Sequence, residues 1–425
     1  MFNAFGPIRH ASPATVIETF KKIRISATGA AARNNGFPMT STIALGFCLF
    51  FTALNLFSLA VALWRCRVRK EPLADRLRQT GLAAPQPPVT IVRPLCGLES
   101  FSEQTLRSTF ELDYPEYEVI FCVQKKNDPI IPLAQSLIAA QPEGRGRLLI
   151  GDDPISPNPK LNNCFKGWQA AQHAFIVLAD SNVLAPRDYL QQMLVRFRPD
   201  VGLVCSPPLG IWPEGPCAEL ECAFLNSFQG RWQFFADAFG MGFAQGKSMM
   251  WRREIVEQAG GIAALASEIA EDAASTKLVR EAGMRVALVA RPFGQPLGKR
   301  TLRAIYQRQT RWARLRRASF PQMYAPEIFA GALPPILAAA YCASDFGLSP
   351  WAAGALVAAL WTLAETFANW RLGWPTNWRS PLAFLARDLI FPVIWIDGWL
   401  GDDFVWQGNS MSVREVADET VDGAA

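Results

Sequence analysis

The segment Phe175-Ile-Val-Leu-Ala-Asp-Ser-Asn182 joins an apolar run to a polar turn. The run Phe175–Ala179 has the length and composition of a strand that is buried on both faces of a sheet. In open α/β sheets, ligands bind beyond the carboxyl ends of the strands. We therefore expect Asp180, the first residue after the run, to lie where a ligand binds.

Strand and helix patterns alternate upstream of this segment. Such alternation indicates parallel strands joined by crossover helices. The sequence thus predicts an α/β domain, with a doubly wound and mostly parallel sheet, over residues 89–320. The expected strands are Val89–Val92, Tyr117–Val123, Arg147–Ile150 and Phe175–Ala179, with helices between them at 104–110, 131–140 and 162–172.

An uncharged apolar run, Ile43–Trp64, precedes the α/β domain. At 1.5 Å per residue it is long enough to cross a hydrocarbon core of about 30 Å. The basic residues Arg65, Arg67, Arg69 and Lys70 follow at once, and the excess of positive charge in cytoplasmic segments predicts that the rest of the chain is cytosolic. A cleaved signal peptide is the alternative, but the run is long and no small-residue cleavage site follows it.

The remaining regions complete the expected domain organisation. Apolar runs return after Ser319, and four charged residues interrupt them: Glu365, Arg387, Asp388 and Asp397. Either these runs span the membrane as a bundle with the charges facing inward, or some lie in the interface. The expected parts are a disordered extension or an over-long start before Met39 (1–38), a transmembrane helix (39–70), a linker (71–88), the α/β domain (89–320), membrane helices (321–404) and a C-terminal tail (405–425).

The composition narrows the possible functions. Half of the 425 residues are apolar, and many of the 14 Trp and 28 Phe lie near the ends of apolar runs, which is typical of membrane proteins. The net charge of +5 suits an anionic leaflet and does not indicate nucleic acid as a partner. The nine cysteines show no metal-site or disulfide pattern, and with only two histidines a general base is expected to be a carboxylate.

Three acidic positions are candidates for chemistry. Asp128 follows the strand Tyr117–Val123 and is placed to accept a hydrogen bond from a nucleotide base or ribose. Asp180 is placed to hold Mg²⁺ or Mn²⁺, because such ions bind one or two carboxylates plus substrate phosphates. Glu271 and Asp272 are candidate bases for a hydroxyl nucleophile. The structural alternatives are a turn at Asp128, a cap at Asp180 and a favourable helix dipole at the acidic pair.

Residues 301–317 are rich in arginine. The planar guanidinium group binds phosphate through two parallel hydrogen bonds, so Arg308 and Arg311 are expected to bind a departing diphosphate. Arg314, Arg316 and Arg317 are expected to contact anionic lipid. The alternative is a basic amphipathic helix that only lies on the membrane.

With these elements in this order, the chain resembles the ceramide glucosyltransferase family, membrane enzymes with a GT-A type catalytic domain. The likeness extends from about Met39 to the stretch ending at Gly408. It rests on the acidic positions and on four further segments: Arg93–Gly97, Phe110–Pro115 with Tyr117–Val119, Asn158–Asn163 and Arg308-Gln-Thr-Arg-Trp312.

The resemblance implies inverting transfer of glucose from UDP-glucose to the hydroxyl of ceramide. Its implied partners are a UDP-sugar donor, a lipid acceptor and membrane lipids, with the catalytic domain on the cytosolic face, which is the inner membrane in a bacterium. Asp272 would be the catalytic base, and Asp180 would hold Mg²⁺ or Mn²⁺. The implied UDP-sugar-binding residues are Asp128, Lys160, Asp180, Arg308, Arg311 and Trp312.

Several positions depart from the family pattern. The D-x-D site is Asp180-Ser-Asn182, which leaves one direct carboxylate ligand for the metal, and Cys205–Pro208 replaces a stretch with a histidine in animal members. Lys125 and Lys126 stand where those members are acidic. These differences indicate a bacterial-type branch in which the acceptor is ceramide or a hopanoid.

Other functions remain open at this level. One is transfer of N-acetylglucosamine to a hopanoid polyol. Another is a processive polysaccharide synthase, which shares the Q-x-x-R-W motif but needs more spanning helices to form a channel. A catalytically inactive membrane scaffold is the third, although a scaffold has no physical need for three acidic positions with Arg311 and Trp312.

Overall fold

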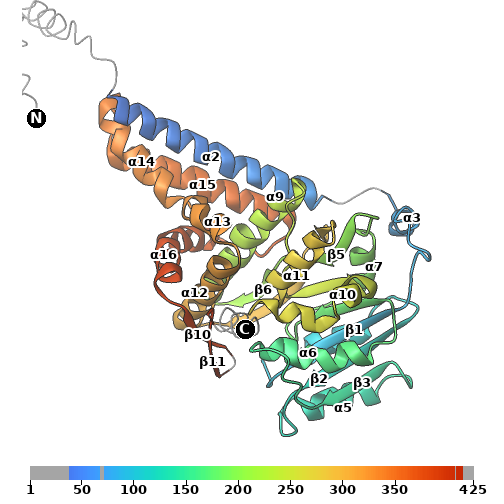
Figure 1. The fold of residues 1–425 in the computed structure, drawn as a ribbon. Coiled ribbons are helices and arrows are strands. Elements are labelled where there is room, and N and C mark those ends of the chain that lie inside the picture. The colour runs from blue at the N-terminus through green and yellow to red at the C-terminus, as the bar shows by residue number, and fades with distance from the viewer. Residues whose placement is uncertain (1–37, 68–70, 407, 415–425) are drawn as a thin grey trace, which may run out of the picture.

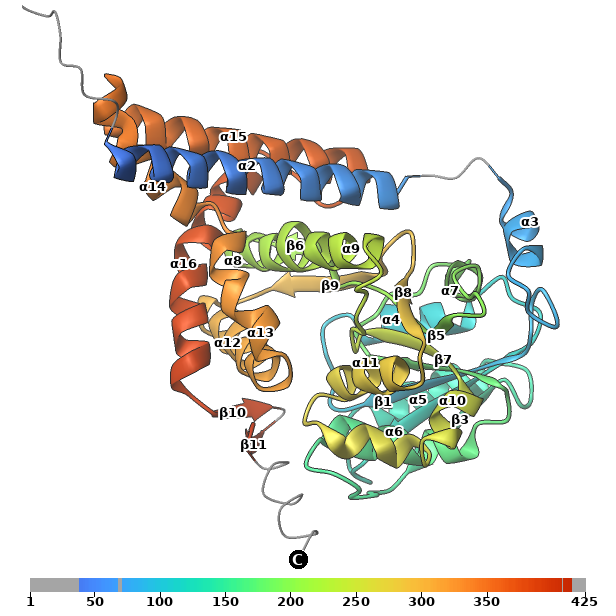
Figure 2. The same ribbon diagram turned by 45° about the horizontal axis from the view of Figure 1, so that its top comes forward.

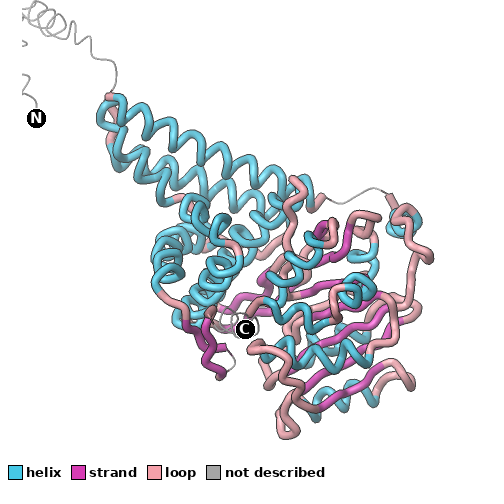
Figure 3. The backbone as a smooth tube through the Cα atoms, in the orientation of Figure 1, coloured by secondary structure: helices cyan, strands magenta, loops and turns pink. Residues whose placement is uncertain are grey.

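The structure is a computed structural model that describes residues 38–67, 71–406 and 408–414. An α/β domain lies beside a helical region that extends away from it (Figure 1). The tube view separates the two, with the larger sheet in one part and the long helices in the other (Figure 3). The disordered extension expected at residues 1–38 lies outside the described residues, apart from Pro38.

A seven-stranded sheet forms the centre of the α/β domain, in the order β3-β2-β1-β4-β7-β5-β8. Neighbouring strands are parallel except for β7, which runs antiparallel to both β4 and β5. A second sheet pairs β6 with β9 in parallel. The strands are β1 (Val89–Leu95), β2 (Tyr117–Val123), β3 (Gly146–Ile150), β4 (Phe175–Ala179), β5 (Val201–Cys205), β6 (Leu209–Glu214), β7 (Ser248–Arg252), β8 (Arg285–Leu288) and β9 (Gly294–Lys299).

Helices cover both faces of the larger sheet. One face packs against α3 (Leu73–Arg78), α4 (Ser102–Arg107), α5 (Ile131–Ala139) and α7 (Tyr189–Leu194). The other packs against α6 (Pro159–Ala170), α9 (Arg231–Ala238), α10 (Arg253–Gln258) and α11 (Glu271–Glu281). The interior strands β2 and β5, each next to an edge strand, are buried along their whole length, as apolar runs in such sheets should be. The predicted fold class, a doubly wound and mostly parallel α/β sheet, is confirmed.

Some elements differ from the expected organisation. The segment expected to be a linker contains α3, because Leu77 finds a buried place against the core. The segment expected to be a tail contains most of an antiparallel hairpin, β10 (Asp403–Trp406) and β11 (Asn409–Ser412). Between β6 and α9, the chain forms α8 (Pro216–Cys222) and a π-helical stretch at Ala223–Gly230, which the sequence patterns did not predict.

Two helices, α2 (Met39–Arg65) and α15 (Pro350–Leu372), are long and apolar enough to cross a membrane. A third span results if Pro321–Ala330 and Leu333–Phe346, which meet at a bend of 50°, act as one unit. The second member of this pair begins with α14 (Leu333–Ala343), which packs beside α2 and α15 (Figure 1). Below this bundle, and to one side of the α/β domain, lie α12 (Leu302–Ser319) and α16 (Ser380–Leu400), and α16 runs at a steep angle to the bundle (Figure 2).

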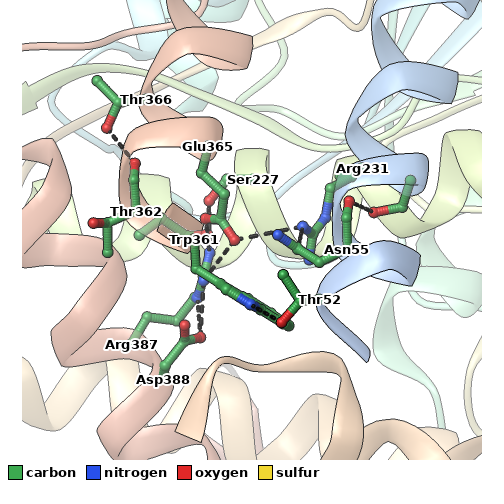
Figure 4. Close-up of polar contacts among 12 residues, drawn as sticks. Thr52, Asn55, Ser227, Arg231, Trp361, Thr362, Glu365, Thr366, Arg387 and Asp388 are labelled. Carbon is green, nitrogen blue, oxygen red and sulfur yellow. Dashed lines mark hydrogen bonds and ion pairs between the residues drawn. The ribbon is translucent and has the colours of Figure 1, made fainter. Parts of the chain in front are cut away.

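A buried polar network joins the bundle to the α/β domain (Figure 4). On α15, Glu365 accepts hydrogen bonds from Arg387 at 2.9 and 3.1 Å and from Arg231 of α9 at 3.4 Å. Arg387 also pairs with Asp388 at 2.8 Å, and Arg231 donates a hydrogen bond to Asn55 of α2. All five side chains are buried. The sequence left two alternatives, a bundle with its charges facing inward or helices in the membrane interface. Glu365, Arg387 and Asp388 face inward, because all three are buried.

This network predicts a large loss of stability on removal of its shared carboxylate. Glu365→Ala leaves two buried guanidinium groups short of a counter-charge, which costs about 3–5 kcal/mol in such cases. The measurement is the thermal unfolding of the full chain in detergent. Thr366→Ala is the matched control, because that hydroxyl bonds only to a carbonyl of its own helix among the described contacts. Equal melting temperatures for the two variants would contradict the prediction.

Candidate active site

The turn after β4 is fixed by a buried arginine. Arg93, on β1, is 1% exposed and donates hydrogen bonds to three backbone carbonyl oxygens of this turn. They belong to Asp180 (2.7 Å), Ser181 (3.0 Å) and Val183 (2.9 Å). A guanidinium group that satisfies three carbonyl oxygens sets the path of the turn. The Asp180 side chain is therefore presented from a rigid base at the carboxyl end of the sheet.

Two lysines hold the Asp180 carboxylate. Lys160, on α6, lies 2.6 Å from one oxygen, and Lys247, just before β7, lies 2.8 Å from the other. Burial alone would raise the pKa of Asp180, but the two ammonium groups outweigh it and lower that pKa to about 2. Asp180 is thus a permanent anion. Sequence reasoning named Lys160 but missed Lys247.

Lys160 connects Asp180 to the acidic pair at the start of α11. Its ammonium group lies 2.5 Å from Glu271 and donates a hydrogen bond to the Gly246 carbonyl at 2.6 Å. Asn158, which caps α6, donates a hydrogen bond from its amide to the other Glu271 oxygen at 2.8 Å. The segment Asn158–Asn163 therefore acts through two side chains that position Glu271.

Asp272 is the carboxylate best suited to accept a proton. Burial, followed by the negative charge of Glu271, raises the pKa of Asp272 to about 6, while Lys160 opposes the rise. One oxygen accepts a hydrogen bond from the Gly246 amide at 3.0 Å. A carboxylate with a pKa of about 6 is largely ionised near neutral pH, yet is basic enough to take a proton from a hydroxyl.

Gly246 is the point where these side chains meet. A Cβ atom at this position would lie 2.7 Å from Glu271 Oε1 and 3.0 Å from Lys160 Nζ. Such an atom would push the acidic pair and the lysine apart. The close approach of backbone to side chains therefore requires glycine.

Asp128 lies at the same edge of the sheet but makes separate contacts. Its carboxylate accepts hydrogen bonds from the amide of Gly97 at 3.0 and 3.1 Å and from that of Ile130 at 3.0 Å. Strand β1 separates β2 from β4, so the strand ends that precede Asp128 and Asp180 are about 10 Å apart. An extended ligand, such as a nucleoside diphosphate, is needed to bridge them.

Arg311, on α12, is close enough to the carboxylate cluster for the charge of Asp180 to affect its pKa. Burial, followed by the charge of Arg308, lowers the pKa of Arg311 to about 10, while Asp180 opposes the shift. Its guanidinium group lies over the Trp406 ring of β10, 5.4 Å from the centroid. In the described part of the chain no carboxylate forms an ion pair with Arg311. A largely buried cation in this state favours binding of an anion.

Arg308 and Trp312 are engaged within the protein. Arg308 pairs with the buried Glu221, which also pairs with Arg300 at 3.1 Å. A diphosphate would have to compete with Glu221 for Arg308, so its role in donor binding stays a prediction. The same holds for Trp312, which packs against a cluster formed by Ala218, Cys222, Leu225 and Leu297.

The arginines expected to contact lipid are also paired inside the molecule. Each joins α12 to another part of the helical region or to the chain that follows it. These ion pairs hold α12 in place, and contact of these arginines with lipid stays a prediction. The pairs are Arg314 with Asp397, Arg316 with Glu327, and Arg317 with Asp402.

Oxygen donors for a divalent cation are present in the turn after β4. Besides the Asp180 carboxylate, the Asn182 side-chain oxygen is buried and accepts no hydrogen bond from described residues. Residues 38–67, 71–406 and 408–414 contain no group of three or more His, Cys, Asp or Glu side chains that could hold a metal ion. The site therefore fits an ion held by one or two protein oxygens plus ligand phosphates, as Mg²⁺ commonly is.

Lys247 and Trp406 are the site residues that sequence reasoning missed. Lys247 precedes β7, and the antiparallel pairing places the start of β7 beside the end of β4. The apolar run after Gly246-Lys247 was visible in the sequence, but a parallel strand there would have put its start at the opposite edge. Trp406 belongs to a hairpin that was expected to be a tail.

Similarity to known proteins gives the class of this protein: a hexosyltransferase, whose described chain includes helices long and apolar enough to cross a membrane. A sequence model described as glycosyl transferase family 21 matches residues 50–418, and the chain belongs to this family. The expected relationship to ceramide glucosyltransferases, which have a GT-A type domain, is thereby confirmed.

Two named ceramide glucosyltransferases agree with this placement. Ceramide glucosyltransferase 1 of Caenorhabditis elegans is 23% identical over 384 residues, covering 88% of this chain and 80% of the relative. The Komagataella phaffii ceramide glucosyltransferase is 43% identical over 107 residues, covering 23% of this chain and 21% of the relative. Among solved structures, a mannosyltransferase from Pyrobaculum calidifontis in complex with GDP-Man and Mn²⁺ is 17% identical, with a TM-score of 0.45 and coverage of 84% and 98%.

Asp272→Asn is expected to lower kcat by about 10²–10⁴-fold, the usual contribution of a general base, while the Kd for UDP changes little. In the unaltered chain, kcat should rise with pH through about 6, because Asp272 must be ionised to accept a proton. Steady-state rates across pH and UDP titrations provide the measurement. Glu281→Gln, at the exposed end of the same helix, is the control; a kcat profile unchanged by Asp272→Asn would exclude this base.

Arg311→Ala is expected to raise the Kd for UDP and lower kcat together. Loss of a charged hydrogen bond to phosphate costs about 1.5–3 kcal/mol, which is roughly a 10- to 150-fold change. Calorimetric titration with UDP and initial rates test this. Arg303→Ala removes an exposed arginine from the same helix and should leave both quantities unchanged. If Arg311→Ala behaved like Arg303→Ala, the diphosphate role would be wrong.

Proposed function

We propose that this chain transfers glucose from UDP-glucose to the hydroxyl of ceramide, with inversion at the anomeric carbon, at the cytosolic face of the membrane. The cluster of Asp180, Glu271 and Asp272 around Lys160 carries the proposal. Membership of family 21 and similarity to a named ceramide glucosyltransferase over 88% of the chain support it.

Donor binding uses the carboxyl edge of the sheet. Asp128 would accept a hydrogen bond from the uridine, and the diphosphate would extend toward the turn after β4. There Arg311 would bind phosphate oxygens, since it lacks a carboxylate partner in the described chain. Asp180, with Asn182 beside it, would hold Mg²⁺ or Mn²⁺, and such an ion would offset the charge that develops on the leaving diphosphate.

Asp272 would act in the transfer step. The ceramide hydroxyl oxygen forms a bond to the anomeric carbon on the side opposite the departing UDP, and the bond from that carbon to the UDP oxygen breaks. The hydroxyl proton moves to the Asp272 carboxylate, and UDP leaves with the bonding electrons. Lys160 and Lys247 keep Asp180 ionised throughout, because their charges hold its pKa at about 2.

The location of the base suits an acceptor that arrives from the bilayer. Ile269, two residues before Glu271, packs with Phe404 and Met411 of the C-terminal hairpin. That hairpin follows α16 and lies beside α12, so the base is close to the helical region (Figure 2). A lipid with its chains in the membrane then needs to place only its headgroup at the cluster.

The test is an acceptor and donor panel with the purified full-length chain. Radiolabelled UDP-glucose and UDP-N-acetylglucosamine are offered with ceramide or with a hopanoid polyol in lipid micelles. We expect label from UDP-glucose in ceramide, as a β-glucoside because the donor linkage is α. A chelator should suppress the rate, and added Mn²⁺ or Mg²⁺ should restore it.

The alternatives give different products in the same assay. Label only in the hopanoid, from UDP-N-acetylglucosamine, would overturn both the donor and the acceptor proposed here. A polymer would identify a polysaccharide synthase. The two or three candidate spans of the described chain give no support to that last alternative, which needs a channel.

A further inference from the structure

A cavity of ≈ 530 Å³ lies where the ends of α2 and α15 meet the α/β domain. Its walls come from three parts of the molecule: the end of α2, the end of α15 with the turn after it, and the start of the paired strands β6 and β9 with the turn before β9. None of the acidic residues of the candidate active site lines it. The volume is within the usual range of about 300–1,000 Å³ for small-molecule sites.

Three arginines line this cavity, one from each part: Arg67, Arg371 and Arg291. All three are exposed, and none forms an ion pair with a carboxylate of the described residues. Arg65, two positions before Arg67, shows the contrast, because it is buried and paired with Asp237. Three like charges that face one cavity without a counter-charge favour a bound anion.

The remaining walls are apolar. Leu63, Leu209, Leu372 and Trp374 contribute to the lining. A site for a free anion has no need of such a surface. A cavity with arginines and leucines together suits a molecule that carries a phosphate on an apolar body.

The cavity lies at the level expected for lipid headgroups. α2 and α15 run in the same direction, since Thr52 bonds to Trp361 and Asn55 lies in the same network as Glu365. Their last turns carry exposed tryptophans, Trp64 and Trp370, which are 52% and 64% accessible. Each tryptophan ring faces an arginine of the cavity at 5.7 or 5.8 Å. Exposed tryptophans with arginines at the ends of apolar helices are typical of the membrane interface.

We infer that this cavity binds the phosphate-bearing headgroup of an anionic phospholipid, distinct from the acceptor lipid. The three guanidinium groups bind the phosphate, and the apolar walls contact the upper part of the lipid chains. Arg291 lies between β8 and β9, so the bound lipid joins the edge of the sheet to both membrane helices. The inference concerns binding alone and does not depend on which sugar or acceptor the enzyme uses.

The test measures lipid binding to the purified full-length chain in neutral detergent. Dioctanoyl phosphatidylglycerol is titrated, and the concentration dependence of Tm gives the apparent Kd. We expect a rise in Tm with this lipid and none with dioctanoyl phosphatidylcholine. The double substitution Arg291→Gln and Arg371→Gln should weaken the apparent affinity by about tenfold or more, since two charged contacts to phosphate are lost.

Arg379→Gln is the matched control. Arg379 is an exposed arginine stacked on Trp378 in the same region, but it does not line the cavity. The Arg379→Gln variant should bind phosphatidylglycerol as the unaltered chain does. Equal affinity in the double variant, or an equal response to both lipids, would overturn the inference. If inorganic phosphate alone reproduced the whole shift, the site would be one for a free anion and the lipid assignment would be wrong.

Discussion

Removing an ion from water costs several kcal/mol, and this cost governs how the molecule is arranged. Two sets of buried charges offset this cost in the same way, by ion pairing. In the helical region Glu365 is shared between Arg387 and Arg231, and in the α/β domain Lys160 is shared between Asp180 and Glu271. In each set one group serves two partners from different elements. The pairing therefore fixes both the local geometry and the relative placement of the helices and the sheet.

The way Lys160 is shared also makes Asp180 and Asp272 differ in their affinity for a proton. Lys160 contacts Asp180 and Glu271, and Lys247 adds a second charge to Asp180. Asp272 instead accepts hydrogen bonds from backbone amides, that of Gly246 among them, and lies beside the negative charge of Glu271. One aspartate is thereby kept ionised, and the other is made more basic. Two identical side chains thus become suited to different tasks, to bind charge and to accept a proton.

Much of the fold could be predicted because its signals are local. The runs at Tyr117–Val123 and Phe175–Ala179 became strands with the predicted bounds, and the apolar run ending at Trp64 became α2. Nothing local revealed that β7 is antiparallel, and so Lys247 was missed although it contacts Asp180. Ion pairs between residues far apart in the sequence cannot be predicted from local patterns either. A run of arginines predicts anion binding, but whether Arg308 faces a ligand or Glu221 depends on how α12 packs.

The C-terminal hairpin bears on what can be removed from the molecule. It reaches the site only after the chain has passed through α14, α15 and α16, and it brings Trp406 over Arg311. A truncation that ended after α12 would discard this tryptophan and strip Arg231 of its carboxylate. The α/β domain is accordingly not independent of the membrane helices. Any water-soluble version would need a substitute for both contacts, and the anchor counts as part of the catalytic unit.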